Sequence, residues 1–399
     1  MSVWDELIGQ HDAVAALQAA AGAAATIARG EALPEGAGSA MTHAWLFTGP
    51  AGSGRSVAAR ALAAALQCER EPAGCGQCSA CHTVATRSHP DVHAVVPEGL
   101  SISVAEMRAV VARSARRPVL GKWQVILLED ADRLTEPAAN ALLKMVEEPP
   151  ARTVVLLCVP SLHPDDVLPT IRSRCRLVSL RTPPAEAISA VLQRDGVAGE
   201  TADWAAAASQ GHVGRARRLA RDEAAREHRT AVLAIPASLT SMAACLSAAD
   251  KLVSSAEAEA KDLSASLDAP ETEALQVALG AGGTGKGTAS TTRGTAGVLK
   301  DLEKRQKSRQ TRTQRDALDR ALVDLAAFYR DVLLVHARSP IAPAHPDFDD
   351  DVRAVALKTR PPDVLRRLDA VLECRTALEL NVKPRIAVEA MTAALRLPA

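Results

Sequence analysis

The sequence predicts an α/β domain followed by a helical region, so the expected fold class is α/β plus all-α. Three observations lead to this prediction. Apolar strand-like runs alternate with helical runs across residues 40–180, which is typical of an α/β sandwich with a parallel sheet. A glycine-rich turn joins the first of these strands to a helix, within residues 43–67. Beyond residue 226 the pattern is helical, and the chain is 47% apolar but only 2% aromatic, which favours alanine- and leucine-rich helix packing.

Length and charge limit the function classes. A chain of 399 residues suggests two or three domains. Its 47 basic and 47 acidic side chains cancel, so an electrostatic grip of the whole chain on nucleic acid is not indicated. No apolar run could span a bilayer, and residues 1–6 are too polar for a signal peptide. We therefore expect a cytoplasmic protein without membrane contact, whose clustered cysteines are metal ligands and not disulfides.

The first strand–helix junction has the pattern of a phosphate-binding loop. Apolar residues 44–48 lead into a glycine-rich turn, and a helix is expected over Val57–Gln67. Backbone N–H groups of such a turn face a phosphate at the helix N-terminus. The pattern requires Lys at the position of Arg55, whose planar fork fits less well among phosphates than a compact ammonium group. The candidate nucleotide-binding residues of this loop are Gly49, Gly52, Gly54, Arg55 and Ser56.

A second part of the candidate nucleotide site is a strand that ends in two acids. Residues 123–128 are apolar apart from Gln124, and Glu129 and Asp130 follow. A carboxylate at this place can hold Mg²⁺ beside a phosphate loop, although two acids at a strand end also suit a solvent-facing position. A helix should begin after Thr135 as N-cap and end before Pro149.

Four cysteines lie in one short segment, with the spacing C-x6-C-x2-C-x2-C. They are Cys68, Cys75, Cys78 and Cys81. Four thiolates complete a tetrahedral shell around zinc and leave no position for water, so a structural Zn²⁺ is expected. An iron–sulfur cluster or reduced free thiols remain alternatives, and His82 or His89 could replace one thiolate.

Longer motifs resemble a known family. The segment Ala139–Lys144, the turn Glu147–Pro150 and the run Ile171–Cys175 resemble the clamp-loader branch of the AAA+ ATPases, which load the sliding clamp onto primed DNA. The resemblance extends over about residues 3–225, beginning at Trp4–Gln10, and the four-cysteine module is typical of bacterial clamp-loader subunits.

The resemblance implies a role for Arg174. In this family the Arg of Ser-Arg-Cys is the arginine finger, which places a cation on the transferred phosphoryl group in the ATP site of a neighbouring subunit. Four positions that a motor subunit uses for its own ATP differ here. Lys becomes Arg55, Asp-Glu becomes Glu129-Asp130, the polar sensor becomes Val159, and the lid arginine becomes Gly214.

The resemblance also implies the organisation and the partners. The expected domains are an α/β AAA+ core over 1–180 with the zinc module at 68–81, a small helical lid over 181–225, and a helical collar over 226–399 with an insertion at about 256–315. Within that insertion, residues 280–299 are rich in Gly, Ala, Thr and Ser and are expected to form a flexible linker. Motor subunits of the tau/gamma type and a delta-type subunit would complete a hetero-pentamer at the replisome, which holds the clamp and primed DNA.

Three functions follow from these patterns. The favoured one is a non-motor clamp-loader subunit, with doubtful ATP or ADP binding and an ATPase activity that is absent or very weak. The second is an active motor subunit, against which Arg55, Val159 and Gly214 stand. The third is a zinc-ribbon DNA-binding module, which neutral charge and few aromatics disfavour. Residues 300–320 carry eight basic and four acidic side chains, which suit a solvated helix face or a contact with DNA or another subunit.

Overall fold

The computed structural model describes residues 2–32, 40–97, 99–114, 117–279 and 292–396. They form two compact units: Met1–Pro97 with Ser101–Ala220, and Glu98–Leu100 with Arg221–Ala399. Each unit is described by itself. Within the described residues, no helix combines the length and the apolar character needed to cross a bilayer.

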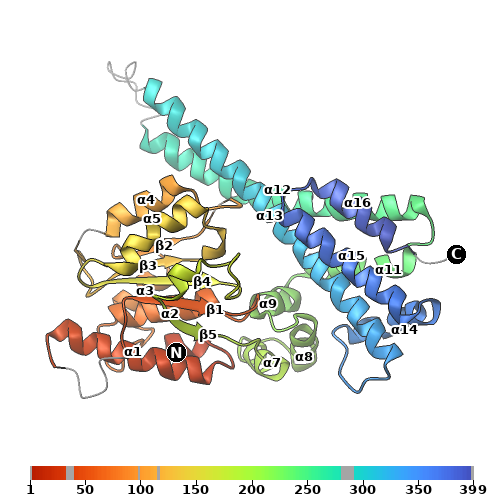
Figure 1. Ribbon diagram of the computed structural model, residues 1–399, viewed down its shortest axis with the longest axis horizontal. Helices are drawn as coiled ribbons and strands as arrows, with labels where there is room; N and C mark the ends of the chain where they lie inside the picture. Colours follow the sequence, from red (N-terminus) through yellow and green to blue (C-terminus); the bar gives the residue numbers. More distant parts are fainter. Residues whose placement is uncertain (1, 33–39, 98, 115–116, 280–291, 397–399) are drawn as a thin grey trace. The chain divides into compact units, whose positions relative to one another are not determined.

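The first unit is built on a parallel sheet of five strands in the order β2-β3-β4-β1-β5 (Figure 1). The strands are β1 (Ala44–Thr48), β2 (Val92–Val95), β3 (Gln124–Leu128), β4 (Thr153–Val159) and β5 (Arg176–Ser179). The central strands β1, β3 and β4 are buried at every residue, as expected for a parallel sheet covered on both faces.

Helices cover the two faces of this sheet. One face packs against α1 (His11–Arg29) and α2 (Arg55–Gln67), and the other packs against α4 (Val104–Ser114) and α5 (Glu136–Glu147). Successive side chains of β1 lie on opposite faces of the sheet. Trp45 and Phe47 belong to the core on the α1–α2 face, and Leu46 belongs to the core on the α4–α5 face.

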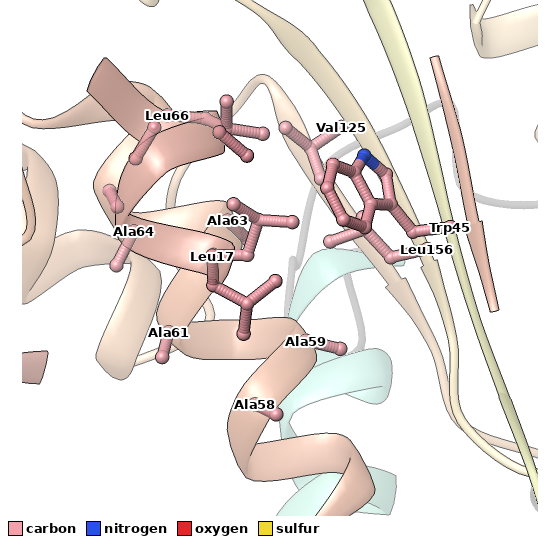
Figure 2. Close-up of a cluster of buried hydrophobic side chains, with 14 of the residues drawn as sticks. Leu17, Trp45, Ala58, Ala59, Ala61, Ala63, Ala64, Leu66, Val125 and Leu156 are labelled. Atoms are coloured by element: carbon pink, nitrogen blue, oxygen red, sulfur yellow. The ribbon is translucent and has the colours of Figure 1, made fainter. Parts of the chain in front are cut away.

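Small side chains let α2 lie close to the sheet. Figure 2 shows the alanines of α2 beside Trp45 and Leu17 of α1, with Val125 and Leu156 of the strands completing the cluster. Trp45 is fully buried, and its indole N–H donates to the carbonyl of Thr42 at 2.9 Å. This packing fixes the start of α2, and therefore the glycine-rich loop that precedes it.

Shorter elements complete the first unit. They are the 3₁₀ turns η1 (Val3–Glu6) and η3 (Ala131–Arg133), and the helices α3 (Ser79–Ala85), α6 (Pro169–Arg172), α7 (Ala185–Arg194), α8 (Gly199–Ala208) and α9 (Val213–Arg221). Helix α5 begins after Thr135, as expected, but the Thr135 hydroxyl donates to the carbonyl of Ile102 at 3.3 Å and does not cap the helix.

The second unit is helical. Its elements are α10 (Glu223–Leu233), α11 (Ile235–Ser238), α12 (Met242–Ala278), α13 (Thr292–His336), η4 (Pro346–Phe348), α14 (Asp349–Lys358), α15 (Pro361–Glu379) and α16 (Pro384–Ala394). The class predicted from the sequence, an α/β core with a parallel sheet followed by helical parts, is confirmed.

The expected linker at 280–299 lies partly outside the described residues, which leave out 280–291. Helix α13 already begins at Thr292, inside the expected linker. Half-buried Leu299 and buried Leu302 supply an apolar edge early in this helix, so packing outweighs the weak helix propensity of Gly and Thr.

A buried carboxylate holds one turn of the first unit. Asp91 is 1% exposed and accepts the N–H groups of Val119, Leu120 and Gly121 at 2.7, 2.8 and 2.6 Å. Burial raises the pKa of Asp91, but the three N–H groups outweigh burial and hold this pKa below its usual range.

We expect Asp91→Ala to lower the free energy of unfolding by about 3 kcal/mol at neutral pH, because hydrogen bonds to a charged group are lost. Since the folded pKa is depressed, this stabilisation is present above about pH 4 and is lost as the pH falls through the folded value. Urea unfolding across this range measures the difference. Asp262→Ala, at an exposed site on α12, is the control. An equal effect of both substitutions would contradict the assignment.

Candidate functional site

The candidate phosphate loop connects β1 to α2, as predicted. Gly54 caps α2 in a left-handed conformation with φ 92°, which places Arg55 and Ser56 in the first helical turn. At Gly49 a Cβ atom would lie 2.5 Å from the carbonyl oxygen of Leu180, so only glycine fits this approach. Buried Ser53 has a hydroxyl without a hydrogen-bond partner among the described residues.

The segment before α9 packs directly on this loop. A Cβ atom at Gly52 would lie 2.5 Å from the Cα of His212, just before α9. The amide of Gln10 also joins the loop to the segment that follows β5. Its nitrogen donates to the carbonyls of Ser53 and Arg181 at 3.3 and 2.6 Å, and its oxygen accepts the N–H of Arg181 at 3.1 Å. Sequence reasoning gave no role to Gln10 or His212.

The acids after β3 are arranged differently from a metal-binding pair. Glu129 accepts from Arg60 of α2 at 2.8 Å and from Arg87, after α3, at 3.3 Å. Two guanidinium groups therefore neutralise the carboxylate that stands where Mg²⁺ is expected. Asp130 has φ 55° and begins η3, so its backbone turns away from the strand direction.

Arg55 shares its surroundings with these acids. Burial raises the pKa of Asp132, as does the charge of Asp130, whereas the charge of Arg55 lowers it. Burial also raises the pKa of Cys158 to about 12, so this thiol at the end of β4 stays protonated and apolar in character. One guanidinium nitrogen of Arg55 is buried without a hydrogen-bond partner among the described residues. The structure therefore places the phosphate loop near the two acids. Glu129 is paired with arginines, however, and not left open to bind the Mg²⁺ of an ATP–Mg²⁺ complex.

Arg174 lies at the other edge of the sheet. Arg176 of β5 pairs in register with Trp45, near the amino end of β1, whereas the phosphate loop follows the carboxyl end of β1. At ~3.3 Å per residue, the strand between Trp45 and Gly49 separates the two edges by about 13 Å. Arg174 therefore lies at the end of the sheet opposite to the phosphate loop of its own chain.

The Arg174 side chain is 42% exposed and held by weak contacts. Its Nε lies 2.9 Å from the carboxylate of Glu147, and its Nη1 donates to the Thr170 carbonyl at 3.0 Å and to the Ser173 hydroxyl at 3.2 Å. Because exposed ion pairs contribute only about 0–1 kcal/mol, little free energy holds Arg174 against its own chain.

The four predicted cysteines converge. The Sγ atoms of Cys68, Cys75, Cys78 and Cys81 all lie within 4.8 Å of one another. The Sγ atoms of Cys68 and Cys78 are 3.9 Å apart, close to the ~3.8 Å between two sulfurs of a tetrahedral site with Zn–S bonds of ~2.3 Å. No histidine belongs to this group, and the His89 ring instead accepts the N–H of Asp91 at 3.1 Å.

Backbone N–H groups support these sulfurs. Cys75 accepts from Gln77 and Cys78 at 3.4 and 3.3 Å, and Cys78 accepts from Cys81 at 3.4 Å. The Gln77 N–H is the main cause that lowers the pKa of the Cys75 thiol to about 6. Such support favours the thiolates that a metal needs, so the group could bind a metal ion such as zinc.

The cysteine module is attached to the N-terminal turn. The N–H of Val3 donates to the Gly74 carbonyl at 3.0 Å, and the Trp4 indole N–H donates to the Ala73 carbonyl at 3.1 Å. On its other side, the Lys122 ammonium donates to the Cys68 carbonyl at 2.6 Å. These hydrogen bonds therefore tie the conformation of the cysteine loop to η1 and to the segment before β3.

Comparison with known families adds to this geometry. Residues 35–184 match the family model described as "DNA polymerase III, delta subunit". This segment is similar to the delta' subunits of DNA polymerase III. It is 44% identical over 137 residues to "DNA polymerase III subunit delta'" of Pseudomonas aeruginosa, which covers 33% of this chain and 41% of that protein.

Two further relatives define the breadth of the similarity. The delta' subunit of Escherichia coli is 37% identical over 158 residues, covering 38% of this chain and 46% of its own. "DNA polymerase III subunit gamma/tau" of Mycobacterium tuberculosis is 34% identical over 157 residues, covering 39% of this chain and 27% of its own. The chain therefore spans less than half the length of each of these relatives.

Proposed function

We propose that the chain is a non-motor subunit of a DNA polymerase III clamp loader, which helps to load the sliding clamp onto primed DNA and donates Arg174 to a neighbouring ATPase subunit. The observation that carries this proposal is the position of Arg174. It lies exposed at the amino edge of the sheet, while the phosphate loop of the same chain lies at the carboxyl edge. A cation in that position can serve an ATP site only on another subunit.

The state of its own phosphate site supports a non-motor role. Glu129 is neutralised by two arginines, and the segment around His212 packs on Gly52. Val159 ends β4 with a buried apolar side chain where a motor subunit has a polar sensor. We infer that the degenerate site binds ATP or ADP weakly or not at all, and that its ATPase activity is absent or very weak.

The cofactor would be a structural Zn²⁺ bound by the four cysteines. Four thiolates complete its coordination and leave no position open for catalysis. The partners are motor subunits of the tau/gamma type and a delta-type subunit in a hetero-pentameric ring. The helical C-terminal domain would form its share of the collar, and the clamp and primed DNA would be bound by the complex.

We expect the purified chain to hydrolyse ATP no faster than a buffer blank. Arg55→Lys should not create activity, because Glu129 remains paired with Arg60 and Arg87. A sensitive phosphate-release assay measures both proteins, with a tau/gamma-type motor subunit as the positive control. Turnover comparable to that of the motor subunit in the unmodified chain would contradict the proposal and favour the second function, an active motor.

A further inference from the structure

Helices α12 and α13 form a long antiparallel hairpin within the second unit (Figure 1). Only part of it belongs to the core of that unit. The core includes α12 from Cys245 to Ala256 and α13 from Ala317 to Val332. Farther out, Ala260 and Ser264 of α12 and Leu302 of α13 are buried. The outer half of the hairpin therefore presents much of its surface to solvent.

Several basic residues of α13 are used to hold the hairpin together. Arg309 pairs with Asp268 and Glu271 of α12, and Arg320 pairs with Glu259 at 2.7 Å. These cations account for part of the basic excess between residues 300 and 320, since they face α12 and are compensated.

Three lysines remain on the outward face. Lys300, Lys304 and Lys307 are exposed, and the structure gives none of their ammonium groups a hydrogen bond or ion pair with a described residue. Their spacings of four and three residues place them within about 60° of one another around the helix, one turn above the next. We refer to these three residues as the basic ridge. Asp301 and Glu303 lie to either side of it, and exposed Thr311 continues its line.

We propose that the basic ridge binds the phosphate backbone of duplex DNA, without regard to base sequence. The ridge is about 10 Å long at 1.5 Å per helical residue, and one strand of a duplex carries about three charges over that length of its axis. Lysine ammonium groups are compact charges with rotatable donors, which suits contacts to phosphate oxygens.

The composition of the ridge favours DNA over an acidic protein surface. Lysine is depleted from protein–protein interfaces, which are centred on aromatic and apolar anchors, and the ridge has none. The ridge adds a DNA contact to the proposed clamp-loader role, but it involves neither Arg174 nor the phosphate loop. Binding by the full chain alone tests it, and the result is independent of any ATPase measurement.

The experiment measures binding of a labelled duplex of about 20 base pairs by fluorescence anisotropy, between about 50 and 200 mM salt. It compares the full chain with the triple variant Lys300→Gln, Lys304→Gln and Lys307→Gln. The matched control is Lys251→Gln, Lys261→Gln and Lys358→Gln, which removes the same charge from exposed sites away from the ridge.

We expect the ridge variant to bind at least about tenfold more weakly, with a log–log salt slope lower by about 2.7, or ~0.9 for each lost phosphate contact. The control variant should stay within about twofold of the unmodified chain, and replacing the three ridge lysines with Arg should preserve binding. Circular dichroism should show the same helix content in all variants, because the ammonium groups of the ridge make no hydrogen bond or ion pair with a described residue.

Three results would overturn the proposal. The first is that the unmodified chain does not bind the duplex at the lowest salt, and the second is that the ridge variant binds as well as the unmodified chain. The third is an equal loss in the control variant, because DNA would then respond to net charge and not to this surface. If instead the ridge variant binds DNA normally but loses a protein subunit of the complex, the ridge contacts an acidic protein surface.

Discussion

Replacing Arg174 with Ala should reduce ATP hydrolysis by the neighbouring motor subunit about 10³-fold, at the one site that receives this arginine. This corresponds to about 4 kcal/mol of transition-state stabilisation. Assembly should be unaffected, because within its own chain Arg174 makes only exposed contacts to Glu147, Thr170 and Ser173. The measurement is single-turnover hydrolysis in the assembled complex, with the other motor sites disabled by mutation.

Two further variants sharpen this test. Arg174→Lys keeps the charge but loses the planar fork, so an intermediate rate is expected. Arg172→Ala removes the same charge two residues away, where the guanidinium donates to the Leu162 carbonyl at 3.4 Å. The motor subunit beside this variant should hydrolyse ATP at the unmodified rate. Full activity of Arg174→Ala, or an equal loss in Arg172→Ala, would rule out the donated arginine.

The sequence alone located those candidate sites whose residues lie close together along the chain. The phosphate loop depends on one strand–turn–helix segment, and the cysteine group lies within 14 consecutive residues, from Cys68 to Cys81. Both were predicted in place, and the structure brings the four sulfurs within 4.8 Å of one another. The roles of these residues in binding nucleotide and metal stay predictions.

Contacts between distant segments could not be predicted in this way. Glu129 is neutralised by Arg60 and Arg87, which are 69 and 42 residues away along the chain. Gln10 reaches Arg181 across 171 residues. Each pair forms because the sheet and its helices bring their segments together, and no local pattern in the sequence marks a partner. The four departures from a motor subunit indicated a degenerate site, but only the structure shows that two arginines pair with Glu129.

For Arg174, the sequence and the structure each supply a different part of the argument. Its role was implied by a family resemblance, and the sequence alone did not show at which end of the sheet it lies. Its position follows from the register, because β1 and β5 are parallel and Arg176 pairs with Trp45 at the amino ends. The sheet order therefore supplies the physical reason to look for the acceptor site on another chain.

Removing the metal from the cysteine module should have the second large effect. The purified chain should contain about one zinc per molecule, and Cys75→Ser combined with Cys78→Ser should abolish its binding. Structural zinc contributes about 10 kcal/mol or more to the folding of small modules, so the loop from Cys68 to Cys81 should unfold without it. Limited proteolysis should then cut within this loop, and elemental analysis measures the zinc.

Loss of zinc should also affect the residues that contact the cysteine module. Val3 and Trp4 bond to its carbonyls, so the N-terminal turn should lose order. Three of the cysteines also belong to the core on the α1–α2 face of the sheet, but the core on the α4–α5 face contains none of the four, so the sheet should remain folded. Cys374→Ser, which removes a buried thiol outside the cluster, is the control and should retain its zinc. Bound iron with visible absorption would identify an iron–sulfur cluster in its place. A chain that contains no metal and resists proteolysis after treatment with a chelator would show that four reduced thiols pack here without a metal, since only packing would then hold the loop.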